Sequence, residues 1–380
     1  DNFVSTWAVS SGTFELPLRD YANITIDWGD SSTSTHNNQA FPTHTYSSPG
    51  TKTITVAVND AAKDIGEMYM NGNHASRTLI RTITNWGEGK WKSFARAFKG
   101  ATYLTIPATD EPDLSLVTLM YDAFRDCINL VGTTLNDWDT STVTGMFRMF
   151  YNASKFNGDI SSWDVSNVTN MNLMFFETLV FDQNLNSWDV SNVTNMSWMF
   201  KGAVEFNQNL NSWDVGEVTT MSKMFYWAKK FNGDISNWNT SKVQNTQSMF
   251  MYAEVFNKDI GDWDVRLLSA WGIDAMFRYA LAFDQDLSRW CVPSLSSEPT
   301  EWSYDSPLRS DYKPVWGTCP QGIQITSTTS GVTDGSSTSD ATIALTFTTV
   351  LETSDFVVGD IDPGNGALSS FTAVSGTVYT

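Results

Sequence analysis

Apolar residues return at a fixed interval of 25 residues through the middle of the chain. Tryptophan recurs at Trp138, Trp163, Trp188, Trp213, Trp238 and Trp263, and two residues late at Trp290. Phenylalanine forms two further columns: Phe150, Phe175, Phe200, Phe225, Phe250 and then Phe277, followed six residues later by Phe156, Phe181, Phe206, Phe231, Phe256 and Phe283. Such a period is typical of stacked repeats, in which each unit buries its apolar face only against its neighbours. It predicts a long rigid surface rather than a catalytic pocket.

The unit at residues 156–180 indicates the local structure of one repeat. Four of its apolar residues follow helical spacing: Val168, Met171, Met174 and Phe175. Ser166 is placed to cap that helix, and the segment 156–160 predicts a short strand. Asp164 is expected to close a turn through its side chain. One strand, one turn and one short helix per unit is the pattern of a leucine-rich repeat, here with Phe, Trp and Met in place of most leucines.

The repeat motif reads Phe-Asn-(Gly/Gln)-(Asp/Asn)-(Ile/Leu)-x-x-Trp-Asp-Val-Ser-x-Val-Thr-x-Met-x-x-Met-Phe. It resembles the repeats of the BspA-like leucine-rich-repeat surface proteins, also called the DUF285 type, over about residues 60–320. The resemblance implies a secreted or cell-surface protein of the kind often proposed as an adhesin. The array proper is expected at residues 98–290, after a bridge and N-terminal cap at 59–97.

The first 58 residues alternate apolar and polar positions in short runs. Ile24, Ile26 and Trp28 share one face of a predicted strand, and a second strand is expected around residues 54–58. The segments Asp27-Trp28-Gly29-Asp30, His44-Thr45-Tyr46 and Pro49–Val56 resemble the signature of PKD-type Ig-like modules, with Ser31 where that family has glycine. The resemblance implies a β-sandwich that serves as a spacer or interaction module.

The pattern of the array stops after Trp290. Residues 291–320 are rich in Ser and Pro and are expected to cap the last repeat, because the end of a stacked array otherwise exposes its core. Residues 321–380 alternate around Ile343–Phe347 and again at Asp355–Ile361, which resembles the first part of a bacterial Ig-like domain. Since Asp1 is not a start methionine and the last domain lacks strands, we expect a trimmed piece of a longer chain. The predicted fold is mainly β with short helices, a leucine-rich-repeat-like solenoid flanked by Ig-like β-sandwich modules.

The composition restricts the partners. The chain of 380 residues has 42 acidic and 23 basic residues and a formal net charge of -19, so nucleic acid and anionic membranes are poor partners. It contains no apolar run long enough to enter a membrane. Cys291 and Cys319 flank the expected C-terminal cap and are predicted to form a disulfide bond, whereas Cys127 is expected to be a buried thiol.

Aspartate and asparagine also recur with the repeat. The first interpretation is that they close turns and bond backbone groups. The alternative is Ca²⁺ binding, because Ca²⁺ takes carboxylate and carbonyl oxygens; no cofactor is otherwise expected. The candidate ligands are Asp159, Asp164, Asp189, Asp214, Asp234, Asp259 and Asp264.

Three tryptophans lie outside the buried columns and are candidate ligand-binding residues: Trp198, Trp227 and Trp271. Motifs of nucleophilic, nucleotide-dependent or zinc enzymes are absent, so no enzymatic activity is expected. The leading hypothesis is an extracellular or cell-surface adhesin that binds a protein or polysaccharide on another cell. Two alternatives stay open: a structural subunit of an extracellular filament, sheath or appendage that binds copies of itself, and a carbohydrate-binding module of a larger secreted protein.

Overall fold

The computed structural model describes residues 1–38, 40–71, 74–132 and 134–319, and the backbone of four strands between residues 324 and 379. The chain divides into two compact units, Asp1–Thr318 and Cys319–Thr380. As predicted, the described part is mainly β. Its helices are α1 (Ala270–Ile273) and the 3-10 helices η1 (Ala75–Thr78) and η2 (Ser310–Tyr312). None of them is long and apolar enough to cross a membrane.

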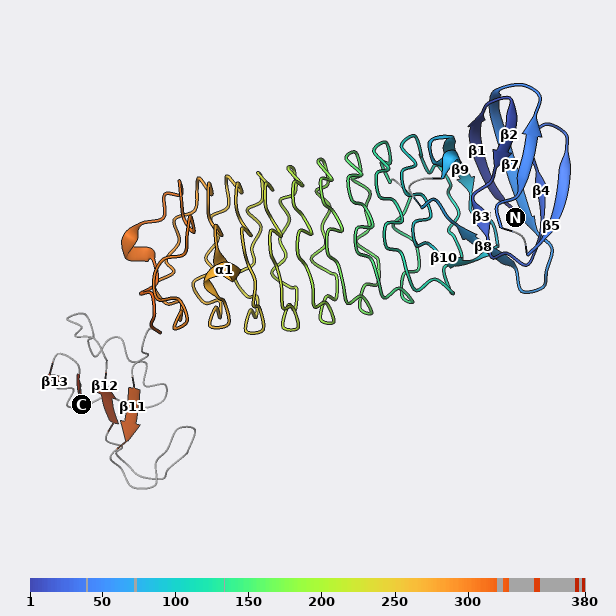
Figure 1. Cartoon of the computed structure of the whole chain (residues 1–380). Coiled ribbons are helices and arrows are strands. Elements are labelled where there is room, and N and C mark those ends of the chain that lie inside the picture. Colours follow the sequence, from blue (N-terminus) through green and yellow to red (C-terminus); the bar gives the residue numbers. More distant parts are fainter. Residues whose placement is uncertain are drawn as a thin grey trace. The chain divides into compact units, whose positions relative to one another are not determined.

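Ten strands form three sheets at the N-terminal end of the first unit (Figure 1). The strands are β1 (Phe3–Val9), β2 (Gly12–Glu15), β3 (Leu18–Arg19), β4 (Asn23–Asp27), β5 (Thr33–Asn37), β6 (Thr43–Tyr46), β7 (Gly50–Val58), β8 (Asp64–Met68), β9 (Ile80–Asn85) and β10 (Lys90–Ser93). The sheets have the orders β5-β4-β7-β1-β9, β10-β8-β3 and β2-β6. The predicted strand faces are confirmed, because Ile24 and Ile26 on β4 and Ile54 and Val56 on β7 are all buried.

The residues of the Trp-Gly-Asp and His-Thr-Tyr motifs pack into one cluster. The His44 ring stacks on Trp28 with centroids 5.0 Å apart, and its Nε2 lies 2.7 Å from Asp30 Oδ2. The Tyr46 hydroxyl donates a 2.8 Å hydrogen bond to the Trp28 carbonyl. The motif therefore ties β4 to β6 across the sheets, while the PKD-type assignment itself stays a prediction.

The sheet does not end at residue 58, where the sequence analysis placed a module boundary. Strand β9 pairs with β1, so residues assigned to a separate bridge complete the N-terminal five-stranded sheet. The physical reason is that β1 would otherwise present an unpaired row of amide and carbonyl groups. Thr82 on β9 and Lys90 on β10 also bridge in parallel to Thr105 and Asp113. The sheet thus provides the surface on which the first repeats stack.

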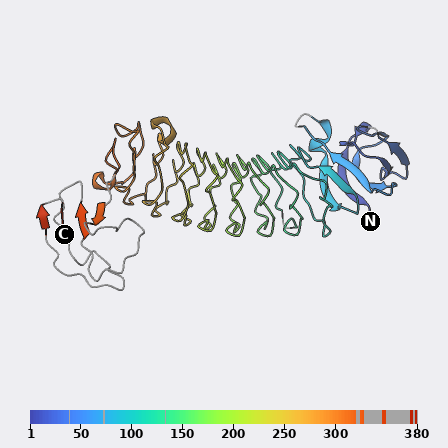
Figure 2. The same ribbon diagram turned by 90° about the horizontal axis from the view of Figure 1, so that it is seen from below.

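Successive repeats lie side by side and are joined by backbone hydrogen bonds (Figures 1 and 2). A column of parallel bridges runs through Leu119, Gly145, Asn170, Asn195, Thr220 and Asn245. In one repeat the amides of Met171, Leu173 and Phe175 donate to carbonyls of the next repeat at 3.0, 3.0 and 2.9 Å. These bonds satisfy the backbone from one unit to the next, so a repeat cannot complete its hydrogen bonding alone.

The helix predicted in each repeat is not formed in the regular repeats, and the segment 156–160 is not a regular strand. Leu173 and Glu177 have φ angles of 59° and 55°, in the left-handed region that interrupts a right-handed helix. The same two positions are left-handed in the next repeat, at Trp198 and Gly202. The apolar spacing that suggested a helix instead reflects consecutive tight turns that return the chain to the core. Ser166 is not a helix cap, since its amide and hydroxyl donate to Asp164.

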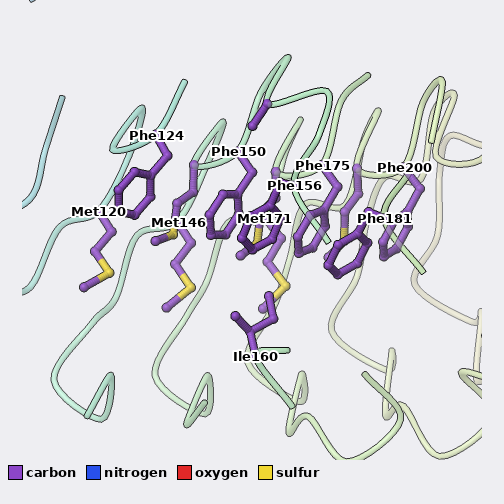
Figure 3. Close-up of a cluster of buried hydrophobic side chains, with 14 of the residues drawn as sticks. Met120, Phe124, Met146, Phe150, Phe156, Ile160, Met171, Phe175, Phe181 and Phe200 are labelled. Carbon is purple, nitrogen blue, oxygen red and sulfur yellow. The ribbon is translucent and has the colours of Figure 1, made fainter. Parts of the chain in front are cut away.

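The predicted Phe, Trp and Met columns form the core of the array. Figure 3 shows members of the Phe and Met columns. Rings of the first Phe column stack on their counterparts one repeat away with centroids 5.4–5.8 Å apart. Within a repeat Phe150 stacks on Phe156 at 3.9 Å. From Trp163 to Trp290 the column tryptophans donate their indole N–H to a carbonyl of the preceding repeat, as Trp163 does to Leu135 at 2.7 Å. Ring stacking and indole hydrogen bonds thus set the register between repeats.

The C-terminal end of the array is closed by aromatic residues. Trp302 is fully buried and packs edge-on against Phe277 and Trp290, and the Phe277 amide donates to its carbonyl at 2.8 Å. Before this end, the irregular repeat around residues 266–273 contains α1, which is capped by Ser269. Cys291 and Cys319 are disulfide-bonded, while Cys127 is a buried free thiol whose pKa is raised by burial.

The second unit contains strands β11 (Gln324–Ser327), β12 (Leu345–Thr348), β13 (Ala373–Ser375) and β14 (Val378–Tyr379). They form a sheet in the order β11-β12-β14-β13, with antiparallel pairing throughout. Ile343 and the segment Asp355–Ile361, where the sequence pattern predicted strands, lie outside the described residues. The Ig-like assignment stays a prediction.

Replacing Phe225 by Ala tests the stacked core. Its ring contacts Phe200, Phe231 and Phe250, so the truncation leaves a cavity and is expected to cost about 3–5 kcal/mol of unfolding free energy. Urea denaturation followed by tryptophan fluorescence measures the loss. The exposed Val255→Ala substitution is the control and should stay within about 0.5 kcal/mol. Equal stability of the two variants would contradict the assignment.

Candidate binding surface

The seven aspartates considered as Ca²⁺ ligands all close turns. Each accepts a hydrogen bond through Oδ1 from the amide two residues later, at 2.9–3.1 Å. A neighbouring column bonds one repeat to the next, as when Asp182 Oδ1 accepts from the Asn207 amide at 2.9 Å. Among the described residues, no three His, Cys, Asp or Glu side chains gather in a group that could hold a metal ion. The geometry therefore favours the turn-closing interpretation, and Ca²⁺ binding stays an untested alternative.

A continuous line of rings and cations near the surface follows the array on the segments directly after the buried Phe column. We call it the outer track, and its main members are Arg125, Tyr151, Phe176, Lys201, Tyr226, Tyr252, Tyr279 and Tyr304. Phe176 is buried and Tyr304 is exposed, while the other members are half-buried. Each touches the next: the successive separations from Arg125 to Tyr304 are 4.5, 4.4, 4.4, 5.4, 5.9, 4.6 and 5.7 Å, between ring centroids or from cation to centroid. The track therefore extends over most of the array.

Backbone geometry accounts for the direction of the first five members, Arg125 to Tyr226, each of which directly follows a column Phe. The residue after each column Phe is flanked by two left-handed positions, such as Trp198 and Gly202 around Lys201 or Lys223 and Trp227 around Tyr226. This alternation turns the column Phe into the core and its successor to the surface. Left-handed backbone is unfavourable for bulky residues. Trp198 and Trp227 nevertheless occupy such positions, at φ angles of 63° and 61°.

Two of the three candidate tryptophans belong to the neighbourhood of the track. Trp198 is half-buried, and the ammonium groups of Lys223 and Lys201 lie 4.4 and 5.1 Å from its ring centroid. Trp227 is 46% exposed and packs edge-on against Tyr252. Trp271 is 65% exposed but lies in α1, where it lines a shallow hollow with residues 294–300. The structure thus separates Trp271 from the other two.

The sequence analysis missed the tyrosines and cations of the track. A signal was present, because the residue after each column Phe is in turn Arg125, Tyr151, Phe176, Lys201, Tyr226, Met251 and Arg278. The residue type in this column varies, while that in the buried columns does not, so the sequence shows no repeated residue there. The contacts between its members appear only when the repeats are stacked.

Near its N-terminal end the track contains a buried carboxylate surrounded by four cations. Asp122 is fully buried, and ion-pair distances to its carboxylate are 3.0 Å from Arg148, 3.1 Å from Lys99, 3.6 Å from Arg125 and 4.0 Å from Arg96. Aromatic faces hold the same cations, as Tyr121 does for Arg96 at 5.2 Å and Phe147 for Arg148 at 5.0 Å. The four cations outnumber Asp122 and Asp126, the two carboxylates that they pair with, so this cluster carries excess positive charge in an otherwise acidic chain.

One family model matches the chain in two places, residues 92–212 and 197–303. It is described as Mycoplasma protein of unknown function, DUF285, and the matches together cover more than half of the chain. The chain belongs to the DUF285 family. The repeat family expected from the sequence is thereby confirmed, and the matched region of this DUF285 protein contains Asp122 and all but the last ring of the track. No curated protein and no solved structure matches the chain.

Asp122→Ala tests the charge cluster of the DUF285 repeats. Removing the carboxylate leaves four crowded cations without their buried counter-charge, and the expected loss is about 3–5 kcal/mol of unfolding free energy. Urea denaturation measures it. Asp126→Ala in the same repeat is the control, since its more exposed pair with Arg125 contributes about 0–1 kcal/mol. A loss below about 1 kcal/mol for Asp122→Ala would show that the cations do not depend on it.

The turn-closing aspartates predict an acid limit of stability. Hydrogen bonds from serine hydroxyls hold the pKa values of Asp139, Asp189 and Asp286 below the ordinary 3.8. A lowered folded-state pKa means that the stabilisation is present above the unfolded-state value and is lost as the pH falls through the folded-state value. We expect the melting temperature to fall below about pH 4 in calorimetry, and to fall less in a variant with Asn at all three positions. An identical acid slope in that variant would contradict the assignment.

Proposed function

We propose that this DUF285 protein is an extracellular recognition protein, an adhesin whose solenoid of repeats presents one rigid surface to a protein or polysaccharide on another cell. The observation that carries the proposal is the outer track, in which neighbouring rings and cations contact one another from Arg125 to Tyr304. Aromatic residues and arginine are enriched in binding surfaces because they supply contact area with directed polar groups.

The stiffness of the array supports this proposal. The repeats are joined by backbone hydrogen bonds and stacked rings, so the surface residues are held at fixed spacing before any ligand arrives. A surface ordered in advance loses less conformational entropy on binding. The bulky residues Trp198 and Trp227 at left-handed positions point the same way, because unfavourable backbone geometry is concentrated at functional positions.

The remaining parts of the proposal extend the expectations drawn from composition, from the absence of enzyme motifs and from the family resemblances. We place the protein outside the cell or on its surface, with no enzymatic activity and no required cofactor. The N-terminal and C-terminal β modules are proposed as Ig-like spacers on either side of the array. Ca²⁺ remains an optional ligand of the aspartate columns, and its role is measured by thermal unfolding in EDTA against millimolar Ca²⁺.

Replacing Trp198 or Trp227 by Ala tests the recognition function. Both substitutions should leave the melting temperature within a few degrees, yet weaken binding by about 1–2 kcal/mol each, because each ring is an aromatic anchor of the surface. Binding is measured by biolayer interferometry against the strongest ligand found on a printed array of polysaccharides and extracellular proteins. Trp271→Ala is the matched control, since that ring is exposed but lies in α1. The proposal would be rejected if the Trp198 and Trp227 variants both bind as the unaltered protein does, or if no ligand is found on the printed screen.

A further inference from the structure

A series of cations follows the outer track and its flanks. Seven of the 23 basic residues lie there: Arg96, Lys99, Arg125, Arg148, Lys201, Lys223 and Arg278. The aspartates of the turn-closing column, by contrast, follow the buried tryptophans in another part of each repeat. A protein with a formal net charge of -19 therefore carries a line of cations and rings along one part of its repeats.

Two of these cations form no ion pair with any described residue. Lys201 and Lys223 are held instead over aromatic rings, including that of Trp198. Burial lowers the pKa of Lys201, and the charge of Glu177 only partly offsets this effect, so the charged form gains from an added anion. Toward the N-terminal end of the track, the four cations around Asp122 outnumber the two carboxylates that they pair with, Asp122 and Asp126. In both places an external anion would add counter-charge.

The aromatic members add an independent constraint on the ligand. Tyr151 and Phe176 are nearly parallel, with an interplanar angle of 1°, and Tyr252 and Tyr279 lie at 12°. Rings stacked along the array cover one another's faces, so they present edges to solvent. Ring edges carry the positive part of the aromatic quadrupole. A ligand that follows the track therefore meets positive ring edges, tyrosine hydroxyls and cations in succession.

We infer that the outer track binds an anionic polysaccharide laid along the repeats. Carboxylate or sulfate groups would pair with the cations of the track, and sugar hydroxyls would bond with its tyrosines. A chain with separated charges suits a track in which a few cations are spaced among rings, whereas the dense phosphates of nucleic acid are opposed by the strongly acidic remainder of the protein. This inference rests on the proposed recognition function and specifies its ligand and surface.

The test measures binding of polygalacturonate, which carries carboxylates, and dextran sulfate, which carries sulfates, with neutral dextran as the uncharged control. The double variant Lys201→Gln/Lys223→Gln removes the two track cations that form no ion pair with a described residue. It should weaken binding of the recognised polymer about tenfold or more, because charge-assisted hydrogen bonds are stronger than neutral ones. Affinity is measured by isothermal titration calorimetry on the full chain. The two polymers separate carboxylate from sulfate recognition.

A matched control carries the same change in net charge elsewhere. Lys242→Gln/Arg266→Gln alters two exposed residues that pair with Glu217 and Asp264 in other parts of the repeats, and should change affinity less than twofold. Lys201→Arg/Lys223→Arg keeps the charges and should retain binding, which separates loss of charge from loss of fold. Circular dichroism of each variant checks that the array stays folded.

Four results would overturn the inference. Three concern the polymers: no binding of either polyanion, an equal loss of affinity in the track and control variants, or equally strong binding of neutral dextran. The fourth is self-association in sedimentation velocity that disappears in Lys201→Gln/Lys223→Gln, which would assign the track to a second copy of this chain. The printed screen of polysaccharides and proteins tests the recognition function separately. If it still shows a ligand whose binding depends on Trp198 or Trp227, the recognition function stands even though this inference fails.

Discussion

The structure depends on backbone hydrogen bonds between one repeat and the next. Amides such as those of Met171 and Phe175 donate across the repeat boundary rather than within their own segment, and the column of parallel bridges runs in the same direction. Stacked phenylalanine rings lie beneath these bonds and exclude water from them. Each repeat is consequently stable only between two neighbours, which is why both ends need covering. The β9 and β10 strands do this at one end, and Trp302 does it at the other.

The same hydrogen bonding decides which side chains reach the surface. Tight turns with two left-handed residues per repeat bring each column Phe into the core and send its successor outward. The buried position must be Phe, because its ring stacks on equivalent rings in both neighbours. The outward position is free to vary, and it varies among Arg, Tyr, Phe, Lys and Met. A uniform core therefore supports a variable surface.

Charge is distributed in accordance with this division. Aspartates of the turn-closing columns are engaged with backbone amides, so their negative charge is part of how each turn is built. The cations of the outer track are instead held over rings, some of them with an acidic partner as well, and Lys201 and Lys223 form no ion pair with any described residue. The turn-closing aspartates thus serve the architecture, while these two lysines remain unpaired by a salt bridge. The low overall pI hides this difference, because it sums over both kinds of position.

The sequence by itself determined the repeat period, the buried columns of Phe, Trp and Met, the strand faces around Ile24 and Ile54, and the turn-closing aspartates. All of these depend on local chemistry repeated at a constant interval, which a single chain displays directly. Only the tertiary structure decided that Met171 and Phe175 belong to turns instead of a helix, since their amides find partners 24 residues away. Only the tertiary structure placed β9 beside β1 and brought Arg125, Tyr151 and Lys201 into one track. Those relationships arise from contacts between repeats, and a pattern read within one repeat does not contain them.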